Sequence, residues 1–270
     1  MMKLKKVYTF ATVCFASLAL AACGSSNSDQ TTLEKIEDKG TLVVALNPEF
    51  PPFEYKQLID GKDTIVGADI ELAKAIGEEL GVEVEFSPMS FSNVLASVQK
   101  GTADVGISGI SATEERAKTY DFSEAYYQSV NKMIVKKDDA AKYSKAEDFA
   151  SVTIGTQKGS IQESVAKEAF ADSSILSLEK NGDLIQQLKS GQLDGVIFEE
   201  PIAKAYVGSN PDLQIVDMDI ETTISDSYAV AMPKGSAELK AKIDKVVKEL
   251  VESGKISDFV EEAYQQSISK

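Results

Sequence analysis

Few kinds of side chain in this sequence could do chemistry. There is no histidine, so the most common general base and metal ligand is missing. Of the two cysteines, Cys14 lies in an apolar N-terminal segment and Cys23 ends that segment. Carboxylates and lysines remain, and Glu199 and Glu200 directly follow a short apolar run. The composition argues against an enzyme and predicts neither a metal site nor a cofactor.

Cys23 follows a segment with the pattern of a secretory signal. Lysines at positions 3, 5 and 6 precede an uncharged, mostly apolar stretch over residues 7–22. This stretch is shorter than the roughly 20 residues of a membrane span. Leu20-Ala21-Ala22-Cys23 resembles a bacterial lipobox, whose thiol receives a diacylglyceryl group before cleavage on its N-terminal side. The alternative is an ordinary signal peptide whose cysteine has no role.

The lipobox pattern predicts where the mature chain is held. We expect a signal peptide over 1–22, a lipidated Cys23 and a flexible tether over 23–38. No second cysteine remains for a disulfide after cleavage. The protein should be anchored by lipid to the extracellular face of the cytoplasmic membrane, which fits a Gram-positive bacterium. With a formal net charge of −15, the chain should bind neither nucleic acid nor anionic lipid surfaces.

Alternating strand and helix patterns must position Glu199. The run TLVVAL is typical of a buried strand, and the next helix has Asp69 as its expected N-cap and Gly81 as its end. This order of elements predicts a parallel sheet covered by helices. The expected elements are strands over 41–46, 82–86 and 104–108 and helices over 69–80, 94–101, 238–253 and 256–264.

An internal repeat relates two parts of the chain. Val94-Leu95-x-x-Val98-x-x-Gly101-x-x-Asp104-x-x-Ile107 recurs as Leu184-Ile185-x-x-Leu188-x-x-Gly191-x-x-Asp194-x-x-Ile197. The matched helix, glycine and strand predict two similarly folded lobes. Ligands bind beyond the carboxyl ends of such strands. Gly109 and Glu199 each lie two residues past the repeated isoleucine, so we expect them to face each other across a cleft.

Longer motifs carry a resemblance to a known family. They are Gly67–Ala73 (GADIELA), Gly109–Arg116 (GISATEER), Asp121–Ser123 (DFS), Tyr126-Tyr127, Gln157–Ser160 (QKGS) and Glu199–Pro201 (EEP). From Thr41 to about Tyr264, the chain resembles the family 3 solute-binding proteins, the polar amino-acid-binding lipoproteins of ABC importers. The resemblance implies an α/β fold of the two-lobed, type II periplasmic-binding-protein class. Two similar parallel-sheet lobes would be joined by a hinge and separated by a cleft.

The resemblance also implies domain boundaries. One lobe should contain residues 39–130 and 225–270, and the other residues 131–224. The crossings between them should lie near Ser129–Met133 and Glu221–Tyr228. Closure on a ligand would follow from contacts that form only when both lobes touch it.

The family's ligand-binding positions fall on polar residues of this chain. The resemblance implies that Arg116 clamps the carboxylate of an α-amino acid through two charge-assisted hydrogen bonds. The Ser111 hydroxyl and the main chain of Gly109 would bind the carboxylate and the ammonium, respectively. Glu199 would pair with the ammonium from the other lobe. Most members of the family have aspartate where this chain has Glu199.

Other positions would complete the site. They are the amide of Gly159 and the hydroxyl of Ser160 near a helix N-terminus, the amides of Asn47 and Gln157, and the aromatic walls Phe50 and Phe91. Amides and aromatic faces suit a planar guanidinium or amide. Some basic-amino-acid binders of the family have aspartate where this chain has Asn47, so one counter-charge is missing here. We therefore expect a polar L-amino acid, with arginine slightly ahead of glutamine.

These residues also have plain structural interpretations. Arg116 follows two glutamates and is compatible with a solvated helical ion pair. Glu199 and Glu200 are compatible with an acidic surface at a strand end. Phe50 and Phe91 are compatible with core aromatics.

The resemblance implies the extracellular substrate-binding subunit of an ABC transporter, a monomer with a membrane permease as its partner. Two alternatives stay open from the sequence. An amino-acid sensor or adhesin domain would capture its ligand by the same physics. The same fold also hosts carboxylate-based dehydratases, although the residues noted above look like binding groups only.

Overall fold

The computed structural model describes residues 30–224 and 226–269. The expected signal peptide, Cys23 and most of the expected tether lie outside the described residues. Within the described residues, no helix has both the length and the apolar character needed to cross a membrane.

The expected tether over 23–38 is wrong at its C-terminal end, because Thr32–Lys39 form helix α1. Thr31 and Glu34 make a capping box, in which each side chain bonds the backbone N–H of the other residue. Ile36 is fully buried in the core. A short polar segment therefore folds because it has a capped start and one apolar anchor.

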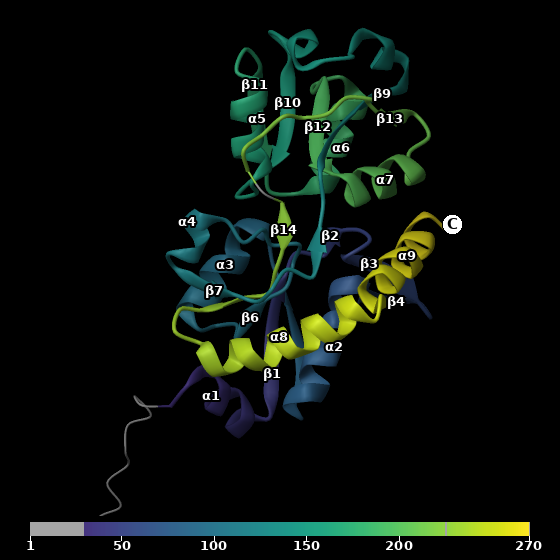
Figure 1. The fold of residues 1–270 in the computed structure, drawn as a ribbon. Coiled ribbons are helices and arrows are strands. Elements are labelled where there is room, and N and C mark those ends of the chain that lie inside the picture. The colour runs from purple at the N-terminus through teal and green to yellow at the C-terminus, as the bar shows by residue number, and fades with distance from the viewer. Residues whose placement is uncertain (1–29, 225, 270) are drawn as a thin grey trace, which may run out of the picture. The chain divides into compact units, whose positions relative to one another are not determined.

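Two sheets of five strands each organise the described chain, and their strands are labelled in Figure 1. The first contains β1 (Thr41–Leu46), β5 (Glu83–Pro88), β6 (Val105–Gly106), β7 (Tyr120–Phe122) and β15 (Ala231–Pro233). The second contains β9 (Asn131–Lys136), β10 (Thr153–Gln157), β11 (Ser174–Leu178), β12 (Gly195–Glu199) and β13 (Leu213–Ile215). Their orders, β5-β1-β6-β15-β7 and β11-β10-β12-β9-β13, are equivalent. We call the parts built on them lobe I and lobe II.

Each sheet has the expected parallel core and one antiparallel strand that the sequence pattern did not predict. β9 pairs antiparallel with β12 and β13, and β15 pairs antiparallel with β6 and β7. Both strands follow a crossing from the other lobe. β9 begins opposite Glu199, the last residue of β12. A chain that enters at the carboxyl edge of parallel strands must run against them.

Helices pack on both sheets. Lobe I carries α1, α2 (Ala68–Leu80), α3 (Phe91–Lys100), the short α4 (Glu114–Ala117), α8 (Ala237–Glu252) and α9 (Lys255–Ile268). Lobe II carries α5 (Gln162–Ala169), α6 (Asn181–Ser190), α7 (Glu200–Ser209) and the 3₁₀ turns Lys137–Lys142 and Ala146–Phe149. Leu72 and Ile76 of α2 share one buried apolar cluster with Ile243 and Val247 of α8. The i, i+4 spacing of these residues explains why one face of each helix is buried.

The repeat has a structural counterpart in each lobe. α3 ends at Gly101 before β6, and α6 ends at Gly191 before β12. Both glycines have left-handed backbone, with φ of 71° and 78°, which favours glycine at a helix C-terminus.

The repeated aspartates bond the neighbouring strand. Asp104 Oδ2 accepts a hydrogen bond of 2.7 Å from Val43 N in β1, and Asp194 Oδ2 accepts one of 2.9 Å from Thr153 N in β10. These residues are therefore structural, and they fix the register of the strands that lead to the cleft.

Two connections join the lobes. The chain leaves lobe I after β8 (Tyr127–Gln128) and returns to it at β14 (Ser227–Tyr228), and these two strands pair antiparallel. The expected lobe boundaries, between residues 130 and 131 and between residues 224 and 225, stay a prediction. Lobe I also carries a hairpin-like sheet of β2 (Glu49–Phe50), β3 (Glu54–Ile59) and β4 (Lys62–Val66).

Candidate functional site

A small cavity lies where the two lobes meet, and the centre of a water-sized sphere can reach only about 10 Å³ of it. Lobe I lines it with Phe50, Phe91, Gly109, Ser111 and Arg116, and lobe II with Gln157, Ser160, Ile161, Gln162, Ile197, Phe198 and Glu199. Most of the expected ligand-binding residues therefore lie together. Asn47 and Gly159 do not line this cavity.

Arg116, the only arginine of the chain, bridges the two lobes. It belongs to α4, where Arg116 N donates to the N-cap Thr113. Its guanidinium donates to Ser111 O at 2.9 Å and, across the lobes, to Gly159 O at 3.0 Å. Its Cζ lies 5.9 Å from the centre of the Phe91 ring. Because a guanidinium has five N–H donors, donors remain for a ligand carboxylate.

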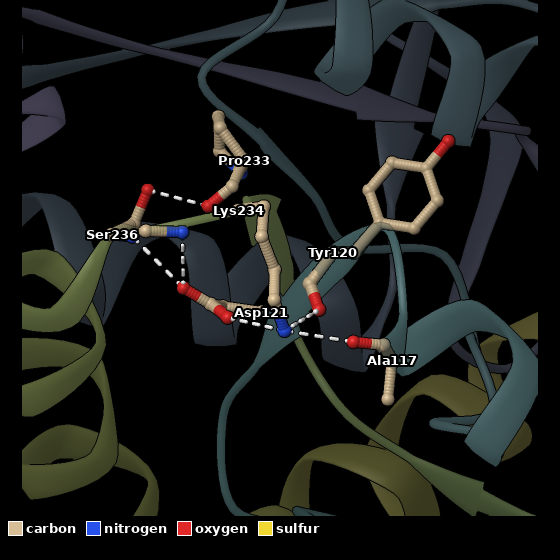
Figure 2. Close-up of polar contacts among 7 residues, drawn as sticks. Ala117, Tyr120, Asp121, Pro233, Lys234 and Ser236 are labelled. Atoms are coloured by element: carbon tan, nitrogen blue, oxygen red, sulfur yellow. Dashed lines mark hydrogen bonds and ion pairs between the residues drawn. The ribbon is translucent and has the colours of Figure 1, made fainter.

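An ion pair outside the cavity fixes the segment that carries Arg116 (Figure 2). Lys234 Nζ donates to Ala117 O, at the end of α4, at 2.8 Å and lies 3.1 Å from Asp121 Oδ1. The other Asp121 oxygen accepts a hydrogen bond of 2.9 Å from Ser236 N, just before α8. The aspartate of the DFS motif thus has a structural role, which is to join α4 to the start of α8.

Gly109 forms a cavity wall that leaves no room for a side chain. Its φ is +52°, and a Cβ there would lie 2.4 Å from Phe50 Cε1. Its N–H donates to Asp69 Oδ2 at 3.0 Å. Asp69 is therefore not the N-cap of α2, as the sequence predicted. Gly67 holds that position, and Asp69 lies inside the first turn and points into the core.

Two buried carboxyl groups lie behind the Gly109 loop. Ser108 Oγ donates to Glu54, and Tyr126 Oη donates to Asp69 Oδ2 at 3.0 Å. Burial, and then the charge of Asp69, hold the pKa of Glu54 well above its usual value. Burial raises the pKa of Asp69 to about 6, against the hydrogen bonds from Gly109 and Tyr126, which lower it.

Glu199 and Glu200 have different surroundings. Glu199 ends β12 opposite Asn131 and is 4% exposed. Burial, and then the charge of Asp226, hold its pKa well above the usual value. Glu200 instead forms an ion pair on the surface of α7, where its Oε1 lies 2.8 Å from Lys204 Nζ. The acidic-surface interpretation therefore fits Glu200, whereas Glu199 belongs to the cavity.

Asp226 is a charged residue beside the cavity that the sequence analysis missed. Ser111 Oγ donates to Asp226 Oδ1 at 2.9 Å, while Oδ2 is buried and has no partner among the described residues. Burial raises the pKa of Asp226 to about 6, against the hydrogen bond from Ser111 and the charge of Arg116. Asp226 stands between two serines in a crossing, where neither a motif nor a helical or strand period marks it. The other cavity residues that were not among the expected ligand-binding residues are Ile161, Gln162, Ile197 and Phe198.

The polar groups of the loop before α5 form hydrogen bonds within the segment 157–163. Gly159 N donates to Glu163 Oε2 at 2.8 Å, and Ser160 Oγ donates to Gln157 O at 2.7 Å. Gly159 has φ of +82°, and a Cβ there would lie 3.2 Å from Ser92 Cα of lobe I. Ser160 thus lines the cavity with its hydroxyl already bonded, and Gly159 permits close approach of the lobes.

Asn47 and Gln157 bond each other. Gln157 Nε2 donates to Asn47 Oδ1 at 2.9 Å, and Asn47 Nδ2 donates to Met89 O at 2.9 Å. Gln157 therefore reaches the cavity, and Asn47 lies behind it.

Two similar lobes, joined by two crossings around a polar cavity, define a two-lobed ligand-binding protein. The cavity has an arginine on one side and a glutamate on the other. In the part of the chain that the structure describes, no cluster of acidic, histidine or cysteine side chains is arranged to hold a metal ion. Residues 42–266 match the bacterial extracellular solute-binding proteins, family 3, and the chain belongs to this family.

The chain is similar to proteins that are named for binding arginine and to one that is named for binding glutamine. The crystal structure of AbpA from Streptococcus pneumoniae, an amino acid ABC transporter substrate-binding protein bound to L-arginine, is 59% identical with a TM-score of 0.86, over 88% of this chain and 100% of that chain. The arginine-binding extracellular protein ArtP of Bacillus subtilis is 37% identical over 89% of this chain and 90% of its own length. The ABC transporter glutamine-binding protein GlnH of Bacillus subtilis is 27% identical over 94% of this chain and 96% of its own length.

Proposed function

We propose that this protein is the extracellular substrate-binding subunit of an ABC transporter and captures a polar L-amino acid, arginine ahead of glutamine. One lobe would contain residues 39–130 and 225–270, and the other residues 131–224. The two lobes would close on the ligand, and a membrane permease would recognise the closed form. The two relatives of highest identity reported above carry arginine in their names or in their crystals.

One observation carries the proposal. The cavity has a guanidinium from lobe I and a carboxyl group from lobe II in its lining, from Arg116 and Glu199. An α-amino acid presents the complementary pair, a carboxylate and an ammonium on one carbon. When both groups are desolvated, each needs a partner of opposite charge. The ligand would then be bound by groups from both lobes, so binding favours closure.

The lining supports arginine as the side-chain choice. Phe50 and Phe91 provide aromatic faces and Gln157 provides an amide, and a planar guanidinium suits both. Phe50 is also a core aromatic residue, because it is buried. The centre of its ring lies 6.0 Å from the centre of the Phe53 ring and 6.1 Å from that of the Tyr228 ring.

A thermal-shift screen of the twenty L-amino acids tests the proposal. A ligand at about 100 times its Kd adds about 2.7 kcal/mol, which for a domain of this size raises Tm by roughly 5–10 °C. We expect arginine to give that shift and glutamine a smaller one. A shift with leucine alone, and none with arginine, lysine, glutamine or histidine, would refute the polar-pocket assignment.

We also propose a lipid anchor at Cys23, with extracellular location, which the lipobox pattern supports. Cys23→Ala should leave the protein unlipidated, either uncleaved or released to the medium. An unmodified Cys23 thiol in protein purified from membranes, seen by mass spectrometry, would contradict the anchor.

Binding without chemistry completes the proposal. The relatives reported above are named as binding proteins. Three other acids lie near the cavity, and each accepts hydrogen bonds from the protein: Glu54 from Ser108, Asp69 from Tyr126 and the Gly109 amide, and Asp226 from Ser111. We therefore expect each candidate amino acid to be recovered unchanged after incubation.

A further inference from the structure

One aromatic wall of the cavity is tied to the opposite lobe. Phe91 is the first residue of α3 in lobe I and lines the cavity. The hydroxyl of the next residue, Ser92, donates a hydrogen bond of 2.7 Å to Glu179 Oε2 of lobe II. Lys158 Nζ lies 2.9 Å from Glu179 Oε1. Hydrogen bonds from Lys158 and then from Ser92 lower the pKa of Glu179, so Ser92 donates to a charged carboxylate, which is a strong acceptor.

The other aromatic wall, Phe50, is fixed within its own lobe. Its side chain is buried, and its ring packs near those of Phe53 and Tyr228. Lobe II bonds only the main chain beside it, where Tyr206 Oη donates a hydrogen bond of 2.9 Å to the carbonyl oxygen of Glu49. This bond joins the lobes, whereas packing inside lobe I sets the position of the Phe50 ring.

Phe91 has a less enclosed position than Phe50. It is half-buried and packs against an apolar cluster of lobe I. Gly159 lets lobe II come close to it, since a Cβ there would lie 3.2 Å from Ser92 Cα. The donor and the acceptor of the bond from Ser92 to Glu179 lie in different lobes, so the bond forms only when the lobes are together. Closure therefore fixes the start of α3, and the Phe91 ring with it.

We propose that Glu179 is a positioning residue, which holds Phe91 in place through Ser92 when the lobes close and so selects arginine over lysine. The inference rests on the proposed function. Both ligands have the same α-carboxylate, the same α-ammonium and the same net charge. They differ at the end of the side chain, because a planar guanidinium stacks on an aromatic face, whereas an ammonium is a compact, strongly hydrated point charge. Stacking needs a ring at a defined place and angle, so a fixed Phe91 favours arginine.

Two other roles of Glu179 would leave the choice between these ligands unchanged. A general clamp would stabilise the closed form equally with either ligand, so its loss would lower both affinities by the same factor. The negative charge of Glu179 would attract the two cationic ligands alike. The ratio of the arginine and lysine affinities therefore responds to the position of the ring and to neither of these effects.

Titration calorimetry of L-arginine and L-lysine into the mature protein measures this ratio. Glu179→Ala removes the acceptor of Ser92 from a partly exposed side chain. It should lower the arginine-to-lysine affinity ratio about three- to tenfold, as expected for the loss of about one hydrogen bond. Glu179→Gln removes the charge but keeps an acceptor for Ser92, so it should retain most of the ratio.

Two control variants accompany these. Tyr206→Phe also deletes a hydrogen bond between the lobes, but beside a ring that lobe I already fixes. It should lower both affinities by the same factor and leave their ratio unchanged. Glu147→Ala makes the same change as Glu179→Ala at an exposed position of lobe II and should alter neither affinity.

The proposed function and the role of Glu179 can fail separately. If the wild type binds no polar amino acid, the proposed function fails and the inference fails with it. If the wild type binds arginine no more tightly than lysine, the protein is still an amino-acid-binding subunit, but the selection at Phe91 is refuted. The role of Glu179 is also refuted if Glu179→Ala keeps the wild-type ratio, if Glu179→Gln loses as much of it, or if Tyr206→Phe lowers it equally.

Discussion

The side-chain amide of Gln157 in lobe II donates a hydrogen bond of 2.9 Å to Asn47 Oδ1 in lobe I. The bond joins the lobes at the wall of the cavity, with Asn47 held in turn by Met89 O. It exists only when the lobes are together. The two amides therefore contribute to the closed form before they contribute to the choice of ligand.

The first prediction concerns this bond. Gln157→Met leaves the buried Asn47 Oδ1 without a donor in the closed form, at a cost of about 1–3 kcal/mol. Arginine affinity should fall roughly 5- to 150-fold, as measured by calorimetry. Gln186→Met, at an exposed position of α6, is the matched control and should bind as the wild type does. Equal affinities of the two variants would show that the amide pair is irrelevant to closure.

The second prediction isolates the carboxylate clamp. Arg116→Ala should weaken L-arginine binding by about 2–5 kcal/mol, because a buried carboxylate loses its charged partner. Agmatine has the arginine side chain and ammonium but no carboxylate, so its affinity should change far less. Titration of both ligands into both proteins gives the coupling energy. A loss that is the same for the two ligands would mean that Arg116 does not bind the carboxylate.

The third prediction concerns the ammonium. Glu199→Gln keeps the length of the side chain but removes its charge, so arginine affinity should fall about 30-fold or more. Glu199→Asp keeps the charge and matches the residue common in the family, so most of the affinity should return. If calorimetry shows that Glu199→Gln binds arginine as tightly as the wild type does, the charge of Glu199 does not hold the ammonium.

The fourth prediction concerns stability and pH. The pKa values of Asp69 and Asp226 are raised from 3.8 to about 6 in the fold. Between about pH 3.8 and pH 6, each of these carboxyl groups binds more protons in the folded state than in the unfolded state. The free energy of unfolding therefore falls as the pH rises through this range. Asp226→Asn removes one of the two carboxyl groups. The ligand-free variant should be more stable than the wild type by about 1–3 kcal/mol at about pH 7, and nearly equal at about pH 4.

Urea denaturation of both ligand-free proteins at the two pH values provides this measurement. The comparison between proteins cancels the surface carboxylates whose pKa values are lowered, such as Asp139 beside Lys142 and Lys136. A variant that is less stable than the wild type near neutral pH would contradict the account of Asp226 as an ionised, buried acid.

Local patterns in the sequence predicted the elements that make the lobes. The repeat places α3 and α6, their terminal glycines and the strands that follow, because helix and strand periods and left-handed glycines are local properties. The antiparallel strands β9 and β15 were not predicted, since their direction depends on the crossing between lobes. Asp69 shows a similar limit, because its partners, Gly109 and Tyr126, are distant in sequence.

The expectations about the site came from motifs rather than from physics alone. Arg116, Ser111 and Glu199 lie in motifs, and all line the cavity. Asp226 has no such mark, and its burial arises only when the second crossing packs against Ser111. The hydrogen bond from Gln157 to Asn47 could not be expected from the sequence, because it depends on how the lobes close.

The most direct test of the account is a crystal structure of the protein with L-arginine. We expect one arginine in the cavity, with its carboxylate within hydrogen-bond distance of the Arg116 guanidinium and its ammonium within that distance of the Glu199 carboxylate. Its guanidinium should lie against Phe50 or Phe91. An arginine bound outside the cavity, or bound with its carboxylate away from Arg116, would contradict the account.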